Sequence, residues 1–153
     1  MTDQKYFEDF VVGERWESPS RTLNDAHFLA FSALTGDTHP VHNDDVYAAA
    51  HPFGKRVAHG LLMASITALG GSDLAPQVHE AILAFVEQRT TFRKPGLIGD
   101  TVRPVFEVVA CEPKRGEKGI VRIRVAVLGS DGEELLEGEH AYLIKGRNWS
   151  APA

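Results

Sequence analysis

The chain has 153 residues, of which 43% are hydrophobic and 24% charged, with a formal net charge of −5 and a single cysteine. This length and composition are typical of one globular domain with a core of its own. The negative charge argues against nucleic-acid binding, because phosphate binding needs a concentrated basic surface. The lone Cys111 excludes an intramolecular disulfide and agrees with a reducing cytoplasm.

Neither a secretory signal nor a membrane span is expected. The first ten residues are mixed polar and acidic, without the basic and apolar regions of a signal peptide. The longest apolar run, around residues 57–70, is too short and too often interrupted by Ser and His to span a bilayer. We therefore expect a cytoplasmic protein that binds neither membranes nor nucleic acids.

The first part of the chain predicts a strand followed by two helices. The strand is expected over Arg15–Leu23. Asn24 is a favoured N-cap, and the apolar and alanine residues after it keep helical spacing up to Gly36. Glycine ends helices readily because it adopts positive φ at little cost. A second, short helix is expected over Asp44–Ala50.

The segment Ala58–Leu69 is apolar on nearly every side and predicts a buried helix. Four strand-like segments follow it, over residues 82–92, 100–110, 119–128 and 134–144. We expect an α+β fold in which one long buried helix is wrapped by a curved antiparallel sheet of about five strands. Residues 1–153 are expected to form a single domain, in which residues 146–153 are expected to be a loose tail.

The last two strands are expected to form a hairpin. Gly129–Gly132 contains the Asp-Gly pair that tight hairpin turns favour. A two-residue loop there places Arg122 and Arg124 on the face that carries Glu137 and Glu139, where opposite charges pair across strands. We interpret these four charges as the solvated outer face of the sheet.

The loop after the first helix carries the strongest functional signal. Asp37, His39 and His42 follow Gly36 and surround Pro40. Proline fixes its own φ and favours an extended residue before it, so this loop is expected to be stiff. A carboxylate and an imidazole held at a fixed separation are what positioned acid–base chemistry requires.

Two motifs resemble those of the MaoC-like dehydratases, the (R)-specific enoyl-CoA hydratase family. The first reads Thr35-Gly36-Asp37-Thr38-His39-Pro40-Val41-His42, with Phe31 before it and Ala48 after it. The second reads Val57-Ala58-His59-Gly60-Leu61. Weaker similarities at residues 92–95 and 99–101 extend the resemblance over roughly residues 6–145. It implies a hotdog fold and the reversible addition of water to a 2-enoyl thioester of CoA or of an acyl carrier protein.

The resemblance gives Asp37 and His42 as the catalytic pair and the Gly60 N–H as donor to the thioester carbonyl oxygen. Hydration adds water at Cβ and a proton at Cα, while negative charge develops on the thioester oxygen. A carboxylate and an imidazole that share one water suit the addition, and a free N–H at a helix start suits the oxyanion. His39 stands where the family has Asn, and we expect it to contribute to substrate binding by donating a hydrogen bond near Asp37. No cofactor and no metal are implied.

Other interpretations of the same residues remain open. Asp37 could cap the loop, and His42 could be a hydrogen-bonded structural histidine. Five side chains in a short span are possible metal ligands, although their spacing matches no regular zinc motif: Asp37, His39, His42, His51 and His59. We interpret His59 itself as structural. A hotdog thioesterase and a non-catalytic acyl-thioester-binding subunit are the alternative functions.

The expected fold also predicts how the chain assembles. One sheet wrapped on one helix leaves an edge strand and part of the catalytic loop uncovered. Hotdog proteins cover such edges by pairing into a dimer with a continuous sheet, and two-fold dimers are the commonest oligomers. We expect a homodimer or an oligomer of dimers, with each active site near the dimer interface.

Overall fold

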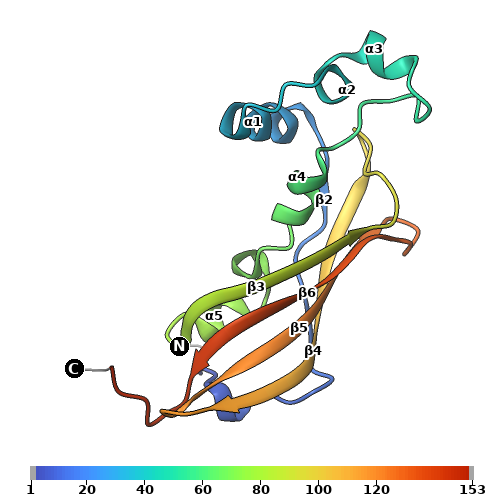
Figure 1. Cartoon of the computed structure of the whole chain (residues 1–153). Coiled ribbons are helices and arrows are strands. Elements are labelled where there is room, and N and C mark those ends of the chain that lie inside the picture. Colours follow the sequence, from blue (N-terminus) through green and yellow to red (C-terminus); the bar gives the residue numbers. More distant parts are fainter. Residues whose placement is uncertain (1–2, 152–153) are drawn as a thin grey trace.

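The computed structural model describes residues 3–151, which contain a six-stranded antiparallel sheet (Figure 1). Its four long strands lie in the order β4, β5, β6, β3. These strands are β3 (Ile82–Phe92), β4 (Thr101–Lys114), β5 (Lys118–Gly129) and β6 (Glu134–Lys145). Two short strands, β1 (Arg15–Glu17) and β2 (Arg21–Thr22), pair with the free side of β4. The sheet therefore has β3 as one edge strand.

Helices α4 and α5 lie against one face of the sheet, while α1, α2 and α3 extend beyond its end as a helical arm (Figure 1). The helices are α1 (Asp25–Thr35), α2 (Pro40–Asn43), α3 (Asp45–Ala49), α4 (Gly60–Ser65) and α5 (Ala75–Val78). Two 3₁₀ turns, η1 (Phe7–Asp9) and η2 (Leu69–Gly71), complete the helical elements of residues 3–151. The predicted α+β class is confirmed.

The central helix is shorter than the sequence predicts. Instead of one helix over Ala58–Leu69, α4 ends at Ser65 and is followed by η2 and α5. The Ser65 hydroxyl donates to the Leu62 carbonyl at 2.7 Å, and the Thr67 hydroxyl donates to the Ala64 carbonyl at 2.6 Å. Because such side-chain hydrogen bonds compete with the helical ladder, apolar content alone overestimated the length of the helix.

The first strand is also divided. Pro19 lies between β1 and β2, and it has no N–H to give to a strand ladder. The single strand expected over Arg15–Leu23 therefore becomes two short pairings with β4. At the other end of the chain, the expected loose tail is tied down at its start, because Arg147 pairs with Asp9 at 2.6 Å.

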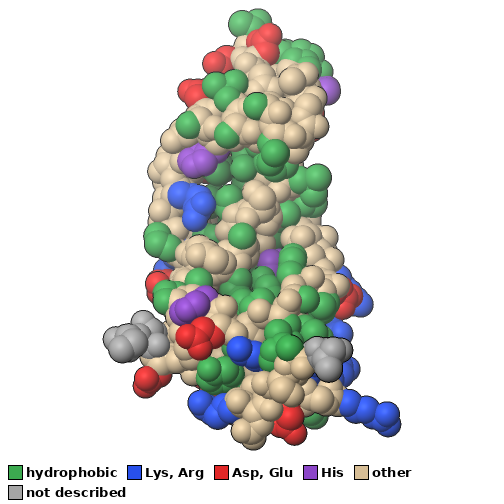
Figure 2. All heavy atoms as spheres, turned by 90° about the vertical axis from the view of Figure 1, so that its left-hand side faces the viewer, with side chains coloured by type: hydrophobic (Ala, Val, Ile, Leu, Met, Phe, Trp, Pro, Cys, Tyr) green, Lys and Arg blue, Asp and Glu red, His purple; other side chains and the backbone are tan. Residues whose placement is uncertain are grey.

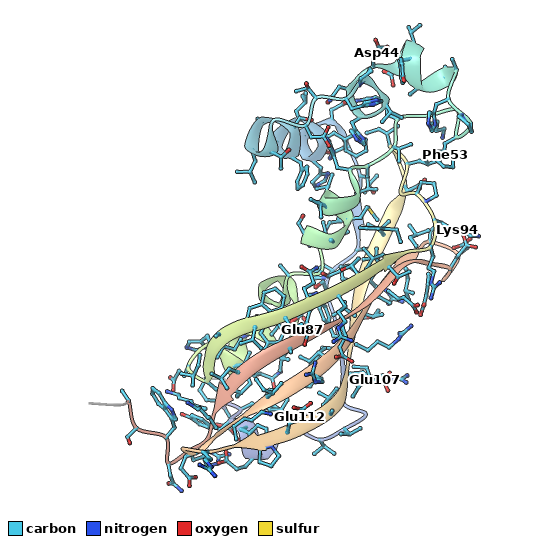
Figure 3. The ribbon with its side chains drawn as sticks, viewed as in Figure 1. Asp44, Phe53, Glu87, Lys94, Glu107 and Glu112 are labelled. Atoms are coloured by element: carbon cyan, nitrogen blue, oxygen red, sulfur yellow. The ribbon has the colours of Figure 1, made fainter. Side chains whose placement is uncertain are left out.

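In the β5–β6 hairpin the charged residues lie on one face of the sheet, as predicted, but the loop is longer than the two residues expected. Four residues, 130–133, connect the strands, and Arg124 lies opposite Glu139. Arg122 Nη1 lies 3.0 Å from carboxylate oxygens of both Glu139 and Glu87. Glu87 and Glu112 are labelled along the sheet in Figure 3, and Glu112 is a third partner of Arg122. The four charges predicted to share a face are part of this larger network of ion pairs.

Two hydrophobic clusters hold the layers together. One lies between α5, η2 and the sheet, and its largest fully buried side chain is Phe106. The other joins α1 and α4 to the opposite end of the sheet around Phe28. This second cluster anchors the helical arm and so fixes the segments that carry the predicted catalytic residues. No helix in residues 3–151 is long and apolar enough to cross a membrane.

Candidate active site

Asp37 and His42 lie on the segment between α1 and α3. Helix α1 ends at Gly36, whose φ of 77° and N–H bond to the Ser32 carbonyl form a left-handed C-cap. The chain then enters α2, with Pro40 in the first turn, where its missing N–H costs nothing. The stiff loop expected around Pro40 is thus a single helical turn.

The structure brings Asp37 and His42 together. Asp37 Oδ2 lies 3.9 Å from His42 Nε2. The Asp37 side chain is 51% exposed and that of His42 14%. The separation is too long for a direct hydrogen bond, but it suits a small molecule that hydrogen-bonds to both atoms. The pair therefore has the geometry for holding one water or hydroxyl group.

The other nitrogen of His42 determines the tautomer of the ring. His42 Nδ1 lies 2.6 Å from the Val57 carbonyl oxygen, which only accepts hydrogen bonds. Nδ1 therefore carries a proton, and in the neutral ring the Nε2 lone pair faces Asp37. Burial lowers the pKa of His42 below its ordinary value, and this outweighs the upward effects of the Val57 hydrogen bond and the Asp37 charge. The neutral, basic form of His42 is favoured.

His59 connects the two candidate catalytic residues. Its ring stacks on that of His42, with centroids 3.8 Å apart and planes inclined by 24°. Its Nε2 lies 3.1 Å from the Asp37 backbone carbonyl and 3.2 Å from the Ser32 hydroxyl. The residue is 2% exposed, and the Phe31 ring packs against it at 4.9 Å. These contacts link His59 to both candidate catalytic residues, and its interpretation as a structural residue stays a prediction.

Gly60 follows His59 at the first position of α4. The first N–H groups of a helix have no acceptor within it, and the Met63 N–H is the group that bonds to the His59 carbonyl. A Cβ at Gly60 would lie 3.3 Å from the Phe92 ring on β3. Glycine therefore allows the Phe92 ring to pack close to the start of α4, beside this N–H.

His39 is used differently from the expectation. Its Nδ1 accepts a hydrogen bond from the Val41 N–H at 3.2 Å and caps α2. Its ring packs edge-on against Tyr47, with centroids 5.7 Å apart. The donor to Asp37 Oδ1 is the His39 backbone N–H, at 3.3 Å. The backbone of His39, and not its side chain, orients the carboxylate.

Asp37, His42 and His59 are also a group that could hold a metal ion, with one ligand atom from each lying within 4.8 Å of the others. The stacking of the two imidazoles argues against this use. Their lone pairs lie in nearly parallel ring planes, and an ion in the plane of one ring lies outside the plane of the other. His42 Nδ1 and His59 Nε2 are already engaged with carbonyl oxygens, so His42 Nε2 and His59 Nδ1, which lie on the two stacked rings, are the nitrogens left to bind an ion. The geometry favours an acid–base pair over a metal site.

Several supporting residues were not foreseen from the sequence. Ser32 is 6% exposed, and its hydroxyl contacts both His59 and the Asn43 side chain. The signal in the sequence was a serine on the apolar face of α1. Arg56 pairs at 2.7 Å with Asp25 at the start of α1 and also at 2.7 Å with Asp45 in α3.

A further support lies in the helical arm at Asp44, which is labelled in Figure 3. The Asp44 carboxylate accepts hydrogen bonds from the N–H groups of Val46 and Tyr47 and so caps α3. Tyr47 in turn packs against His39. The cap therefore helps to hold the segment that carries the candidate pair.

Residues 9–128 match the family described as "MaoC like domain". This chain belongs to that family. It is 34% identical over 143 residues to an (R)-specific enoyl-CoA hydratase of Rhodospirillum rubrum, with 93% of each protein covered. The resemblance stated from the two motifs is thereby confirmed.

Solved structures agree with the fold. An Archaeoglobus protein described as a monoamine oxidase regulatory protein superposes with a TM-score of 0.87 at 32% identity, covering 94% of this chain and 96% of that one. A Mycobacterium tuberculosis protein described as a double hotdog fold superposes with a TM-score of 0.79 at 24% identity, covering 98% of this chain and 47% of that one. The predicted hotdog fold is confirmed.

Proposed function

We propose that this protein is an (R)-specific enoyl-CoA hydratase, a hydro-lyase that adds water to a 2-enoyl thioester and, in reverse, dehydrates a 3-hydroxyacyl thioester. The observation that carries the proposal is the 3.9 Å separation of Asp37 Oδ2 and His42 Nε2, together with the Gly60 N–H, which bonds to no backbone carbonyl of residues 3–151. The similarity to the (R)-specific enoyl-CoA hydratase of Rhodospirillum rubrum supports the substrate class and the stereochemistry.

The proposed addition begins with a water held by the Asp37 carboxylate and the His42 lone pair. Neutral His42 takes one proton at Nε2 while the water oxygen bonds to Cβ and the double-bond electrons move towards the thioester. The proton on Nε2 is then delivered to Cα, which restores the neutral ring. Hydroxyl and proton are thus both accounted for, and Asp37 orients the water and stabilises the imidazolium.

The enolate oxygen formed during addition needs a donor already in place. In the proposal this donor is the Gly60 N–H, because backbone donors at a helix start need no reorganisation when charge develops. His59 links the oxyanion donor to the acid–base pair, because its backbone precedes Gly60 and its side chain contacts both Asp37 and His42. The distance between the oxyanion donor and the acid–base pair is therefore held by one buried residue.

Incubation of the purified protein with crotonyl-CoA tests the proposal. Loss of the absorbance of the conjugated double bond, with formation of (R)-3-hydroxybutyryl-CoA, is the expected result. Release of free CoA thiol would instead indicate the thioesterase alternative. Tight binding of thioesters of several chain lengths without turnover would indicate a non-catalytic binding subunit.

We also propose that the working form is a homodimer in which two β3 strands pair. Strand β3 is an edge strand of eleven residues, and Phe85, Val86 and Phe92 on it are each about half exposed. A long apolar edge is a liability unless a partner covers it. A second copy related by a two-fold axis would continue the sheet. Light scattering at micromolar concentration tests this, and an active monodisperse monomer would contradict it.

A further inference from the structure

A groove with a cavity volume of about 280 Å³ lies between the helical segment 64–70 and strands β3 and β6. Figure 2 views the molecule from the helical side and shows hydrophobic side chains along the middle of this face. Most of the lining surface is apolar, but five of the eleven lining residues carry polar groups: Ser65, Thr67, Gln88, His140 and Tyr142. An all-alkyl ligand does not need such a lining.

The groove leads away from the proposed oxyanion donor. Ala64, which lines it, stands one helical turn after Gly60 on the same face of α4, about 6 Å along the axis. Strand β3 runs beside the groove, with Phe92 next to Gly60 and Phe85 stacked on Tyr142 at 4.9 Å. A thioester whose carbonyl binds at Gly60 therefore has its acyl chain directed into this groove.

Three of the polar residues form a buried chain of hydrogen bonds. His140 Nε2 lies 3.3 Å from the Thr67 hydroxyl, and His140 Nδ1 lies 3.2 Å from the Tyr142 hydroxyl. His140 is 2% exposed, Thr67 1% and Tyr142 6%. Burial lowers the pKa of His140 to about 4 and raises that of Tyr142 to about 12. The chain is therefore uncharged near neutral pH.

The direction of these bonds follows from the Thr67 hydroxyl, which donates to the Ala64 carbonyl at 2.6 Å. Its oxygen must then accept from His140 Nε2, which leaves Nδ1 as the acceptor for the Tyr142 hydroxyl. The Leu69 backbone N–H is a further donor group near the Tyr142 oxygen and opposes the effect of burial on its pKa. Within residues 3–151 these are the partners of that oxygen, so one of its lone pairs remains to accept from a ligand.

We propose that this groove selects acyl chains that carry a hydroxyl group, which donates to the Tyr142 oxygen, over alkyl chains of the same length. The proposal rests on the proposed function and names the substrate class within it. A neutral acceptor suits an uncharged hydroxyl donor, whereas a carboxylate would bring an unpaired charge against it. Ser65 and Gln88 add further polar groups to the lining of the groove.

The test compares matched substrates in the wild-type protein. We expect kcat/KM to be about 3- to 10-fold higher for 5-hydroxy- or 6-hydroxy-2-hexenoyl-CoA than for 2-hexenoyl-CoA, the value of one buried hydrogen bond. In Tyr142→Phe the ratio should fall to about one, while Tyr6→Phe, whose hydroxyl donates to Glu80 and does not line the groove, keeps the wild-type ratio. A wild-type ratio of one or below, or a ratio that survives in a folded Tyr142→Phe protein, would overturn the proposal.

Competitive inhibition keeps the proposal testable if Tyr142→Phe does not fold. Saturated 6-hydroxyhexanoyl-CoA should inhibit wild-type hydration of crotonyl-CoA several-fold more tightly than hexanoyl-CoA, and equal inhibition would count against selection. Absence of crotonyl-CoA hydration is the failure of the proposed function. Calorimetric binding of the two saturated thioesters then still decides whether the groove prefers the hydroxyl.

Discussion

Protonation of His140 is expected to destabilise the fold in mild acid. The ring is 2% exposed and is held between Thr67 and Tyr142, and burial lowers its pKa to about 4. In the unfolded chain the pKa of a histidine is about 6.5. The unfolded state therefore binds a proton first as the pH falls, and the free energy of unfolding falls with it.

The magnitude follows from the two pKa values. The contribution that neutral, buried His140 makes to the free energy of unfolding is fully present above about pH 6.5, and it decreases as the pH falls towards 4. A gap of about 2.5 between the pKa values is worth roughly 3 kcal/mol, of which about 2 kcal/mol is lost by pH 5. His42, whose pKa is also lowered by burial, contributes in the same direction.

The measurement is urea unfolding at pH 7.5 and pH 5 for the wild type and for His140→Gln, in which the titrating group is removed. The decrease in unfolding free energy between the two pH values should be smaller by about 2 kcal/mol in His140→Gln. His79→Gln, at an exposed histidine, should keep the wild-type decrease. Equal decreases in wild type and His140→Gln would refute the reasoning.

Three further predictions concern the site. Asp37→Asn and His42→Ala should each lower kcat for crotonyl-CoA by roughly 10²–10⁴, and the double variant should lose little more, because both residues act on one water. Full turnover in either single variant would show that the substituted residue does not take part in the reaction. Gly60→Ala should lower kcat/KM by at least about ten-fold with the fold kept, since the new methyl meets Phe92 at 3.3 Å; an unchanged value would mean that a methyl group at residue 60 does not obstruct the approach of the thioester to this N–H. His59→Ala should cost about 2–4 kcal/mol of stability through the cavity that it leaves, measured by thermal unfolding, and a loss under 1 kcal/mol would mean that the stack on His42 supports little.

Local signals in the sequence predicted the elements well. Asn24 caps α1 through the His27 N–H, and Gly36 ends it in a left-handed conformation, because both roles depend on a few neighbouring atoms. The shared face of Arg124 and Glu139 followed from period-two alternation, and the structure adds that the two residues lie opposite each other. The break after α4 was missed because apolar periodicity does not register how Ser65 and Thr67 hydroxyls bond to backbone carbonyls.

The site was predictable only in part, for a physical reason. Asp37 and His42 are close in sequence, and a family motif carries them. The partner of His42 Nδ1 is the backbone carbonyl of Val57, which any residue would supply, so no side chain marks it. The stack of His59 on His42 depends on how α4 packs against α1, which is tertiary information. Residue identity indicates the reacting groups, and packing sets their tautomer and separation.

His39 shows how a departure from the family pattern can keep the same local structure. Where the resemblance expects Asn, the Nδ1 of His39 accepts from the Val41 N–H and caps α2, a task that an Asn side chain also performs. Because the side-chain oxygen of Asn can accept the same hydrogen bond, His39→Asn should keep kcat within about three-fold of the wild-type value. His39→Ala, without a cap, should lose about 1 kcal/mol of stability in urea unfolding. Equal stability of His39→Ala and wild type would show that the cap contributes nothing, and an inactive His39→Asn would mean that the ring itself touches the reacting atoms.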